Sequence, residues 1–153
     1  WTPEPGSFPP LMYVQGLAKR RNIGSSSNLI EENVMPYVDG FVVPVSKDNI
    51  ERYKEMSTKC GKIWRELGAL EFRECMGDDV KPGKLTSFPQ SVNLEDGEVV
   101  FFSWIVYESR AKRDEVNDKV MKDPRMAEWM KPENMPFDGK RMVYGGFEMV
   151  VDV

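Results

Sequence analysis

Two acidic residues stand in stretches of sequence that otherwise suit a protein interior. Asp39 lies in the apolar segment from Tyr37 to Val45, and Glu74 lies in the segment from Ala69 to Met76. A carboxyl group removed from water has a raised pKa and can serve as a general acid or base near neutral pH. We therefore treat both residues as candidate catalytic groups. The alternative is a structural network in which they pair with Arg73, Arg113 or Arg141.

Three further side chains are candidates for ligand binding. Trp104 could stack on a flat organic molecule, with packing in a core or an interface as the ordinary alternative. Arg141 and Tyr144 could hold an anionic group. Asp78 and Asp79 are adjacent carboxylates in a turn-rich segment. Without further spaced ligands they indicate a solvated turn, so we expect no metal site.

The composition excludes several classes of chemistry. The chain has 153 residues and no histidine, which rules out Ser-His-Asp and Cys-His catalysis, His-ligated zinc and His-ligated haem. Its two cysteines, Cys60 and Cys75, are too few for a disulfide framework or a four-thiolate zinc site. We expect both to be buried thiols in a reducing compartment, with one bridge between them as the alternative. No cofactor is expected.

Charge and hydropathy narrow the range of partners. The formal net charge is -4, whereas a nucleic-acid binder normally carries a basic surplus, so we expect no nucleic-acid partner. No apolar run approaches the roughly 20 residues of a membrane span. The chain begins at Trp1, which would fit either a removed targeting segment or a shortened start. We expect the cytoplasm or, if Trp1 is a processed start, an organelle matrix or stroma.

The first 34 residues differ in composition from the rest. They contain four prolines before Leu11 and a Gly-Ser-Ser-Ser run at 24–27, so we expect an extended arm at 1–34 followed by one domain at 35–153. Aromatic residues are unusual in a purely solvating tail. The arm is therefore either a disordered tail or a segment that lies on a partner protein. Its candidate anchors are Trp1, Phe8, Leu11, Met12 and Tyr13.

Apolar patterning predicts four strands, at 37–45, 69–76, 97–107 and 141–151. The third is the longest apolar run, GEVVFFSWIVY, and both of its faces are apolar. A strand with one wet face would alternate apolar and polar residues, so each face of this strand must be covered. In the last strand, the glycine pair at 145–146 predicts a bulge or a close backbone approach.

Two helices are predicted between these strands. Apolar residues recur at steps of three and four from Ile50 to Leu67, which predicts an amphipathic helix that Gly68 ends. A second, highly charged helix is expected from 110 to 122, with Arg113 on a solvated face. The segment 77–90 is expected to be a loop.

The resulting order, β-α-β-β-α-β, predicts a ferredoxin-like α+β fold, in which two helices cover one face of a four-stranded antiparallel sheet. The other face would remain apolar and exposed in a monomer. We therefore expect a homodimer in which two such faces pair into an α+β barrel.

Several segments are similar to a known family. They are MPYVDGFVVPV from Met35, ECMGDDV from Glu74, VVFFSWIVYESRAKRD from Val99, MKDPRM from Met121 and MPFDGKRMVYGGFE from Met135. Together they resemble the YbaA-like family of small bacterial proteins, a domain of unknown function within the dimeric α+β barrel superfamily, over residues 35–152. Met76 departs from the tryptophan that is more frequent there. The resemblance implies a ferredoxin-like protomer that dimerises, and it implies no activity.

Two functions from different classes remain. The favoured hypothesis is a non-catalytic dimeric binding or assembly protein, which could be an accessory subunit of a larger complex docked through residues 1–34. The alternative is a small cofactor-free monooxygenase or isomerase that uses Asp39 or Glu74, with Trp104 and Tyr144, in a barrel pocket. An apolar cavity with convergent carboxylates would favour the enzyme, and a filled barrel would favour the binding protein.

Overall fold

The structure is a computed structural model that describes residues 34–153. The predicted arm at 1–34, with its candidate anchors, lies outside the described residues apart from Val34. In chain order the elements are β1 (Tyr37–Ser46), η2 (Lys47–Asn49), α1 (Ile50–Leu67), β2 (Glu71–Met76), α2 (Phe88–Ser91), β3 (Glu98–Tyr107), α3 (Arg110–Lys122), η3 (Pro124–Met126), η4 (Pro132–Asn134) and β4 (Val143–Glu148).

The strands form one antiparallel sheet in the order β2-β3-β1-β4. The central pair, β1 and β3, is in register along its whole length, from Tyr37 opposite Tyr107 to Ser46 opposite Glu98. β2 and β4 are the edge strands. With α1 between β1 and β2 and α3 between β3 and β4, this is the ferredoxin-like arrangement. The predicted α+β class is confirmed.

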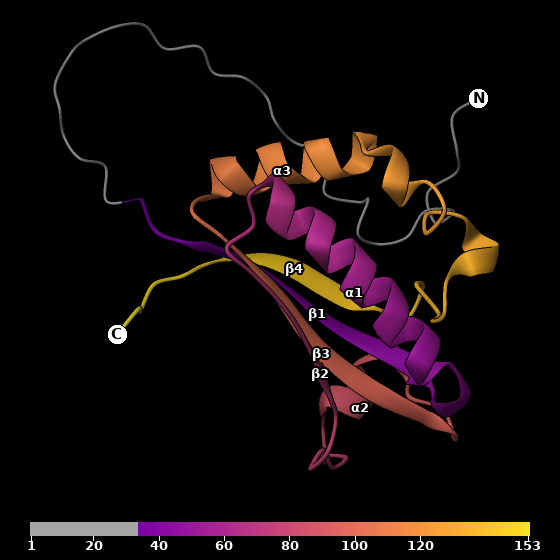
Figure 1. Ribbon diagram of the computed structural model, residues 1–153. Coiled ribbons are helices and arrows are strands. Elements are labelled where there is room, and N and C mark those ends of the chain that lie inside the picture. Colours follow the sequence, from indigo (N-terminus) through magenta and orange to yellow (C-terminus); the bar gives the residue numbers. More distant parts are fainter. Residues whose placement is uncertain (1–33) are drawn as a thin grey trace, which may run out of the picture.

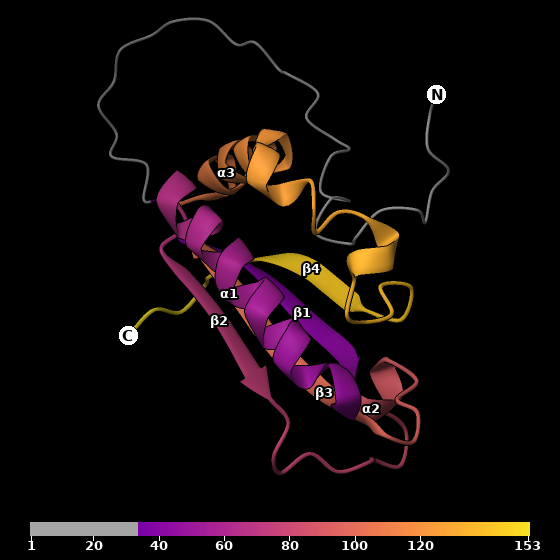
Figure 2. The same cartoon turned by 45° about the vertical axis from the view of Figure 1, so that its right-hand side comes forward.

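Both long helices lie on the same side of the sheet, as Figure 1 shows. The view turned by 45° in Figure 2 places α1 along β2 and β3, with α3 beyond its end. The hydrophobic core fills the layer between helices and sheet. Its buried residues are Phe41, Val43, Val45, Tyr53, Met56, Cys60, Ile63, Trp64, Ala69, Phe101, Ile105, Tyr107, Val116, Val120, Met126 and Met142.

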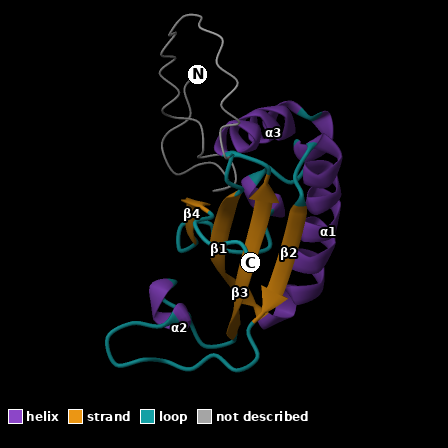
Figure 3. Cartoon of the chain, turned by 90° about the vertical axis from the view of Figure 1, so that its left-hand side faces the viewer, coloured by secondary structure: helices purple, strands orange, loops and turns teal. Residues whose placement is uncertain are grey.

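β3 has two apolar faces in different surroundings. Phe101 and Ile105 are 3% and 2% exposed beneath the helices, whereas Phe102 on the opposite face is 45% exposed. Figure 3 looks onto this second face, with α1 and α3 behind the sheet. We call it the open face. The prediction that helices cover only one face of the strand is confirmed.

Two segments differ from the sequence predictions. The last strand is shorter than 141–151, because Arg141 belongs to the preceding turn, where its N–H donates to the carbonyl oxygen of Asp138. The predicted loop at 77–90 leads into α2, where the Ser87 hydroxyl accepts a hydrogen bond from the Gln90 N–H, a capping-box spacing that the sequence displays. The pairing of β4 with β1 continues without interruption through the two glycines of β4. A Cβ at Gly146 would meet the hydroxyl of Tyr37, so the glycine pair marks a close approach and not a bulge.

Candidate functional site

Asp39 and Glu74 both point to the helix side of the sheet, but the structure does not bring them together. Asp39 on β1 lies opposite Ile105 of β3, and Glu74 on β2 lies opposite Ser103 of β3. The two carboxyl groups are therefore separated by the width of β3 and a diagonal offset, on the order of 10 Å. Each has its own set of partners.

Asp39 lies in a buried polar network between β1 and α3. One of its oxygens is 3.7 Å from Nε of Arg113, and the other accepts a hydrogen bond of 3.4 Å from the amide of Asn117. Arg113 is 6% exposed, and its guanidinium stacks on the Tyr37 ring and donates to the Tyr37 hydroxyl. The prediction of a solvated Arg113 is wrong, because this residue lies on the side of α3 that faces the sheet.

The amide oxygen of Asn117 completes this network. It accepts hydrogen bonds of 3.0 Å from both Nε1 of Trp64 and the hydroxyl of Tyr107. Burial raises the pKa of Asp39, and the charge of Arg113 and the hydrogen bond from Asn117 oppose that rise. Since the carboxylate faces a fixed cation and an amide in a filled interior, the arrangement fits the structural alternative for Asp39.

Glu74 has hydroxyl partners and no cation within ion-pair distance among the described residues. Its Oε2 accepts a hydrogen bond of 2.9 Å from Tyr53, and its Oε1 accepts one of 3.2 Å from Ser57. Burial raises the pKa of Glu74 to about 7, and the hydrogen bonds from Tyr53, Ser57 and Ser103 only partly oppose this. A carboxyl group with this pKa can both accept and donate a proton near neutral pH.

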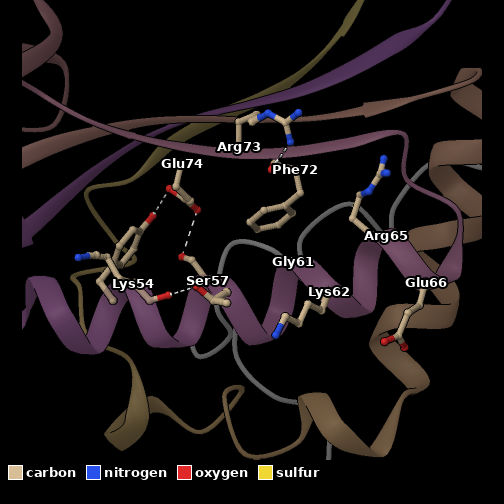
Figure 4. A pocket seen from close by; sticks show the side chains of 11 residues that line it. Lys54, Ser57, Gly61, Lys62, Arg65, Glu66, Phe72, Arg73 and Glu74 are labelled. Carbon is tan, nitrogen blue, oxygen red and sulfur yellow. Dashed lines mark hydrogen bonds between the residues drawn. The ribbon is translucent and has the colours of Figure 1, made fainter.

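Glu74 borders a groove between α1 and the edge strand β2, which we call the α1–β2 groove (Figure 4). Its volume is about 570 Å³, within the range of small-molecule sites. Tyr53, Ser57, Gly61 and Arg65 recur at steps of four along α1 and therefore share the helix face that borders it. The remaining lining residues are Lys54, Thr58, Lys62, Glu66, Phe72 and Arg73.

Deeper in the same region, the interior is filled. The space enclosed between Phe41, Tyr53, Glu74 and their neighbours amounts to only about 30 Å³, which is about the volume of one water molecule. No organic ligand fits there. A pocket that would hold a substrate between both carboxyl groups is therefore absent from the described residues.

The structure separates the three predicted ligand-binding residues. Trp104 lies on the open face, where its Nε1 is 3.4 Å from Glu71. Tyr144 lies opposite Phe41 in the register of β4, on the helix side of the sheet. The guanidinium of Arg141 is held by Glu98, at 2.6 and 2.8 Å, and by Asp138, at 2.9 Å. These ion pairs make Arg141 a clamp between the last turn and β3.

Neither a metal site nor a membrane-spanning helix is found within residues 34–153. No group of three or more cysteine or acidic residues there is placed to hold a metal ion. None of the helices in that range has the length and apolarity needed to cross a bilayer. Cys60 is buried and Cys75 is exposed, and both are free thiols. The expectation that both are buried is thus wrong for Cys75, which lies on the edge strand β2.

Comparison with known proteins assigns the chain to a group without a known activity. Residues 36–139 match the family model described as "Protein of unknown function (DUF1428)". The uncharacterized protein YbaA of Escherichia coli K12 is 52% identical over 118 residues, which span 77% of this chain and 99% of that protein. The Shigella flexneri protein of the same name matches to the same extent. The predicted resemblance is confirmed.

Among solved structures, a crystal structure described as a dimeric ferredoxin-like protein from an uncultured marine organism is similar in fold. It has a TM-score of 0.50 and 13% identity, and the match covers 77% of this chain and 99% of that one. At this identity the likeness establishes the fold alone.

Proposed function

The chain belongs to the DUF1428 family, whose description assigns no activity, and we propose from its geometry that it is a homodimeric binding protein whose two open faces pair into an α+β barrel. The observation that carries this proposal is the apolar open face. Phe102, Val143 and Phe147 are 45%, 43% and 61% exposed on it. A single chain would leave these side chains in water, and a second copy would cover them.

The side chains on the open face support a self-complementary interface. Apolar side chains come from all three of β1, β3 and β4, since Val42 lies between Phe102 and Val143 in the register. Phe102 packs against Trp104, at 5.7 Å between ring centroids, and against Phe88 of α2, at 5.6 Å. Aromatic residues grouped in this way are typical of the core of an interface. The solved relative in fold is itself described as dimeric.

The proposal is tested by the mass of the full chain in solution. Phe102→Glu and Phe147→Glu each place a charge on the open face, and we expect multi-angle light scattering to show a monomer with an unchanged circular dichroism spectrum. Leu85→Glu is the matched control, because Leu85 is 97% exposed in the loop before α2. It should remain a dimer. A wild-type monomer would contradict the proposal, as would open-face variants that dimerise like the control.

A second candidate function is the cofactor-free enzyme, and Glu74 favours it. A carboxyl group with a pKa of about 7 at the side of a groove meets the requirements of a general acid or base. Trp104 lies on the other face of the sheet, so such an enzyme would use Glu74 with Tyr53 and Ser57. Its test is turnover of any organic substrate that Glu74→Gln abolishes while binding persists.

Docking of residues 1–34 to a larger complex stays a prediction, as do the anchors Trp1, Phe8, Leu11 and Tyr13. The free thiols Cys60 and Cys75 support a reducing compartment. Native purification from the source would test the complex. A mass above that of the dimer is expected, and a free dimer would contradict this part of the proposal.

A further inference from the structure

The α1–β2 groove carries positive charge that the rest of the described chain does not neutralise. Lys54, Lys62 and Arg65 of α1 line it, whereas the side chain of Arg73, opposite Trp104 in the register, turns to the other face of β2. Lys54 pairs with Glu51 at 3.1 Å. Arg65 and Arg73 donate to the carbonyl oxygens of Ala69 and Phe72, and no carboxylate of residues 34–153 lies within ion-pair distance of either residue or of Lys62.

The acidic residues of the groove do not compensate these cations. Glu66 is already paired with Arg125 at 2.8 Å. Glu74 is half-buried and receives hydrogen bonds from Tyr53 and Ser57. The groove therefore has a local surplus of positive charge, although the chain as a whole has a net charge of -4. Such a surplus attracts an anion.

An apolar surface lies between the cations. The Phe72 ring extends from β2 toward α1, as Figure 4 shows. A Cβ at Gly61 would lie 2.6 Å from Cδ1 of Phe72, so glycine at this position is what allows the ring to lie on the helix. The ring is half-buried and lines the groove with the hydroxyl groups of Tyr53 and Ser57.

We propose that the α1–β2 groove binds a small organic anion, with a flat apolar body against Phe72 and a carboxylate held by Lys62 and Arg65. Guanidinium groups hold carboxylates by paired, charge-assisted hydrogen bonds, and the apolar body gains from contact with the ring. The volume of about 570 Å³ limits the ligand to a small molecule. This inference names the ligand class of the proposed binding protein and therefore rests on that role, although not on the dimer.

The test uses 2-naphthoate as the anionic probe and 2-naphthamide as its uncharged analogue, titrated into the ¹⁵N-labelled full chain. We expect naphthoate to shift the amide resonances of Gly61 and Phe72 and the side-chain Nε resonance of Arg65. The affinity should lie in the range of about 0.1 to 1 mM, as is usual for a fragment-sized ligand. Naphthamide should bind about tenfold more weakly.

A charge-reversal pair identifies the site. Lys62→Glu with Arg65→Glu should weaken naphthoate binding about tenfold or more, because two attractive contacts become repulsive. Arg110→Glu with Lys119→Glu changes the net charge equally at two exposed positions of α3 and is the matched control. It should bind within about twofold of the wild type.

Three results would overturn the inference: no saturable shift at about 10 mM naphthoate, equal affinity for naphthamide, or equal weakening in the control pair. Light scattering on the same samples reports the dimer separately. A monomer that still binds naphthoate would overturn the dimer alone, and a dimer that fails to bind would overturn the groove alone.

Discussion

Asp39 and Glu74 have similar neighbours in the sequence but different partners in the structure. Both are acidic residues in apolar strands, and both point toward the helices. Asp39 meets the buried cation of Arg113 in a filled interior. Glu74 meets only hydroxyl groups, at the side of a groove. The comparison teaches that the partner, and not burial alone, decides whether a buried carboxyl group stabilises a fold or remains available for chemistry.

The largest effect is expected from removing each carboxyl group in turn. Asp39→Ala breaks the buried ion pair and leaves Arg113 with only the half-exposed Asp114, at 3.2 Å, as a counter-ion, which should lower the free energy of unfolding by about 3 kcal/mol. Glu74→Ala leaves two hydroxyl donors without an acceptor and should cost only about 1–3 kcal/mol. Urea denaturation measures both.

Glu74→Ala and Asp39→Ala serve as controls for each other, since both delete a carboxyl group from the same side of the sheet. Equal losses would contradict the distinction between an ion-paired and a hydroxyl-bound carboxylate. Asp39→Asn, which keeps a polar group of the same shape but not its charge, should also destabilise the protein.

The second expected effect is a pH dependence that belongs to Glu74. Burial raises the pKa of Glu74 from 4.5 to about 7, so between these values the folded protein binds more protons than the unfolded chain. The free energy of unfolding therefore falls as the pH rises from about 4.5 to about 7, by at most about 3 kcal/mol. Because the chain has no histidine, no ordinary side chain titrates between pH 5.5 and 7 to obscure the slope.

Glu74→Gln isolates this contribution. The amide does not titrate, so the variant should lose the part of the slope that Glu74 supplies, while any contribution of Asp39, whose pKa is also raised, remains. Chemical denaturation at closely spaced pH values gives both curves. Parallel curves for the two proteins would mean that Glu74 does not titrate in this window.

The fold could be predicted because it follows from local sequence patterns that the structure keeps. Alternation in β3 and the three-to-four periodicity of α1 depend on neighbours in the chain, and the order of the elements then admits few topologies. α2 was missed, although Ser87 and Gln90 carry a capping-box spacing. The open face was visible as a second apolar side of the strand around Phe102.

The sequence predicted only part of the candidate site, because the register of the strands decides which side chains meet. The sequence showed that Asp39 and Glu74 are unusual residues for apolar strands. It did not show that Asp39 would face Arg113 and that Glu74 would face Ser57. Ser57 interrupts the apolar stripe of α1 four residues after Tyr53, and this interruption was the available signal. The grouping of Trp104 with Tyr144 failed because the pairing of β4 with β1 puts Tyr144 on the helix side.

The smallest expected effect concerns the hydroxyl groups that hold Glu74. Burial keeps the pKa of Tyr53 well above its usual value, so its hydroxyl remains a donor throughout the window in which Glu74 titrates. Tyr53→Phe deletes the 2.9 Å hydrogen bond and should raise the pKa of Glu74 further, by up to about one unit. Ser57→Ala deletes the longer bond of 3.2 Å and should raise it less. The side-chain ¹³C shift of Glu74 reports this pKa directly, and the shift of Asp39 in the same spectra is the internal reference, since neither hydroxyl contacts it. A fall in the pKa of Glu74 would show that these hydroxyl groups do not stabilise its carboxylate, and an equal change at Asp39 would show that the two carboxyl groups are coupled and do not form two separate sites.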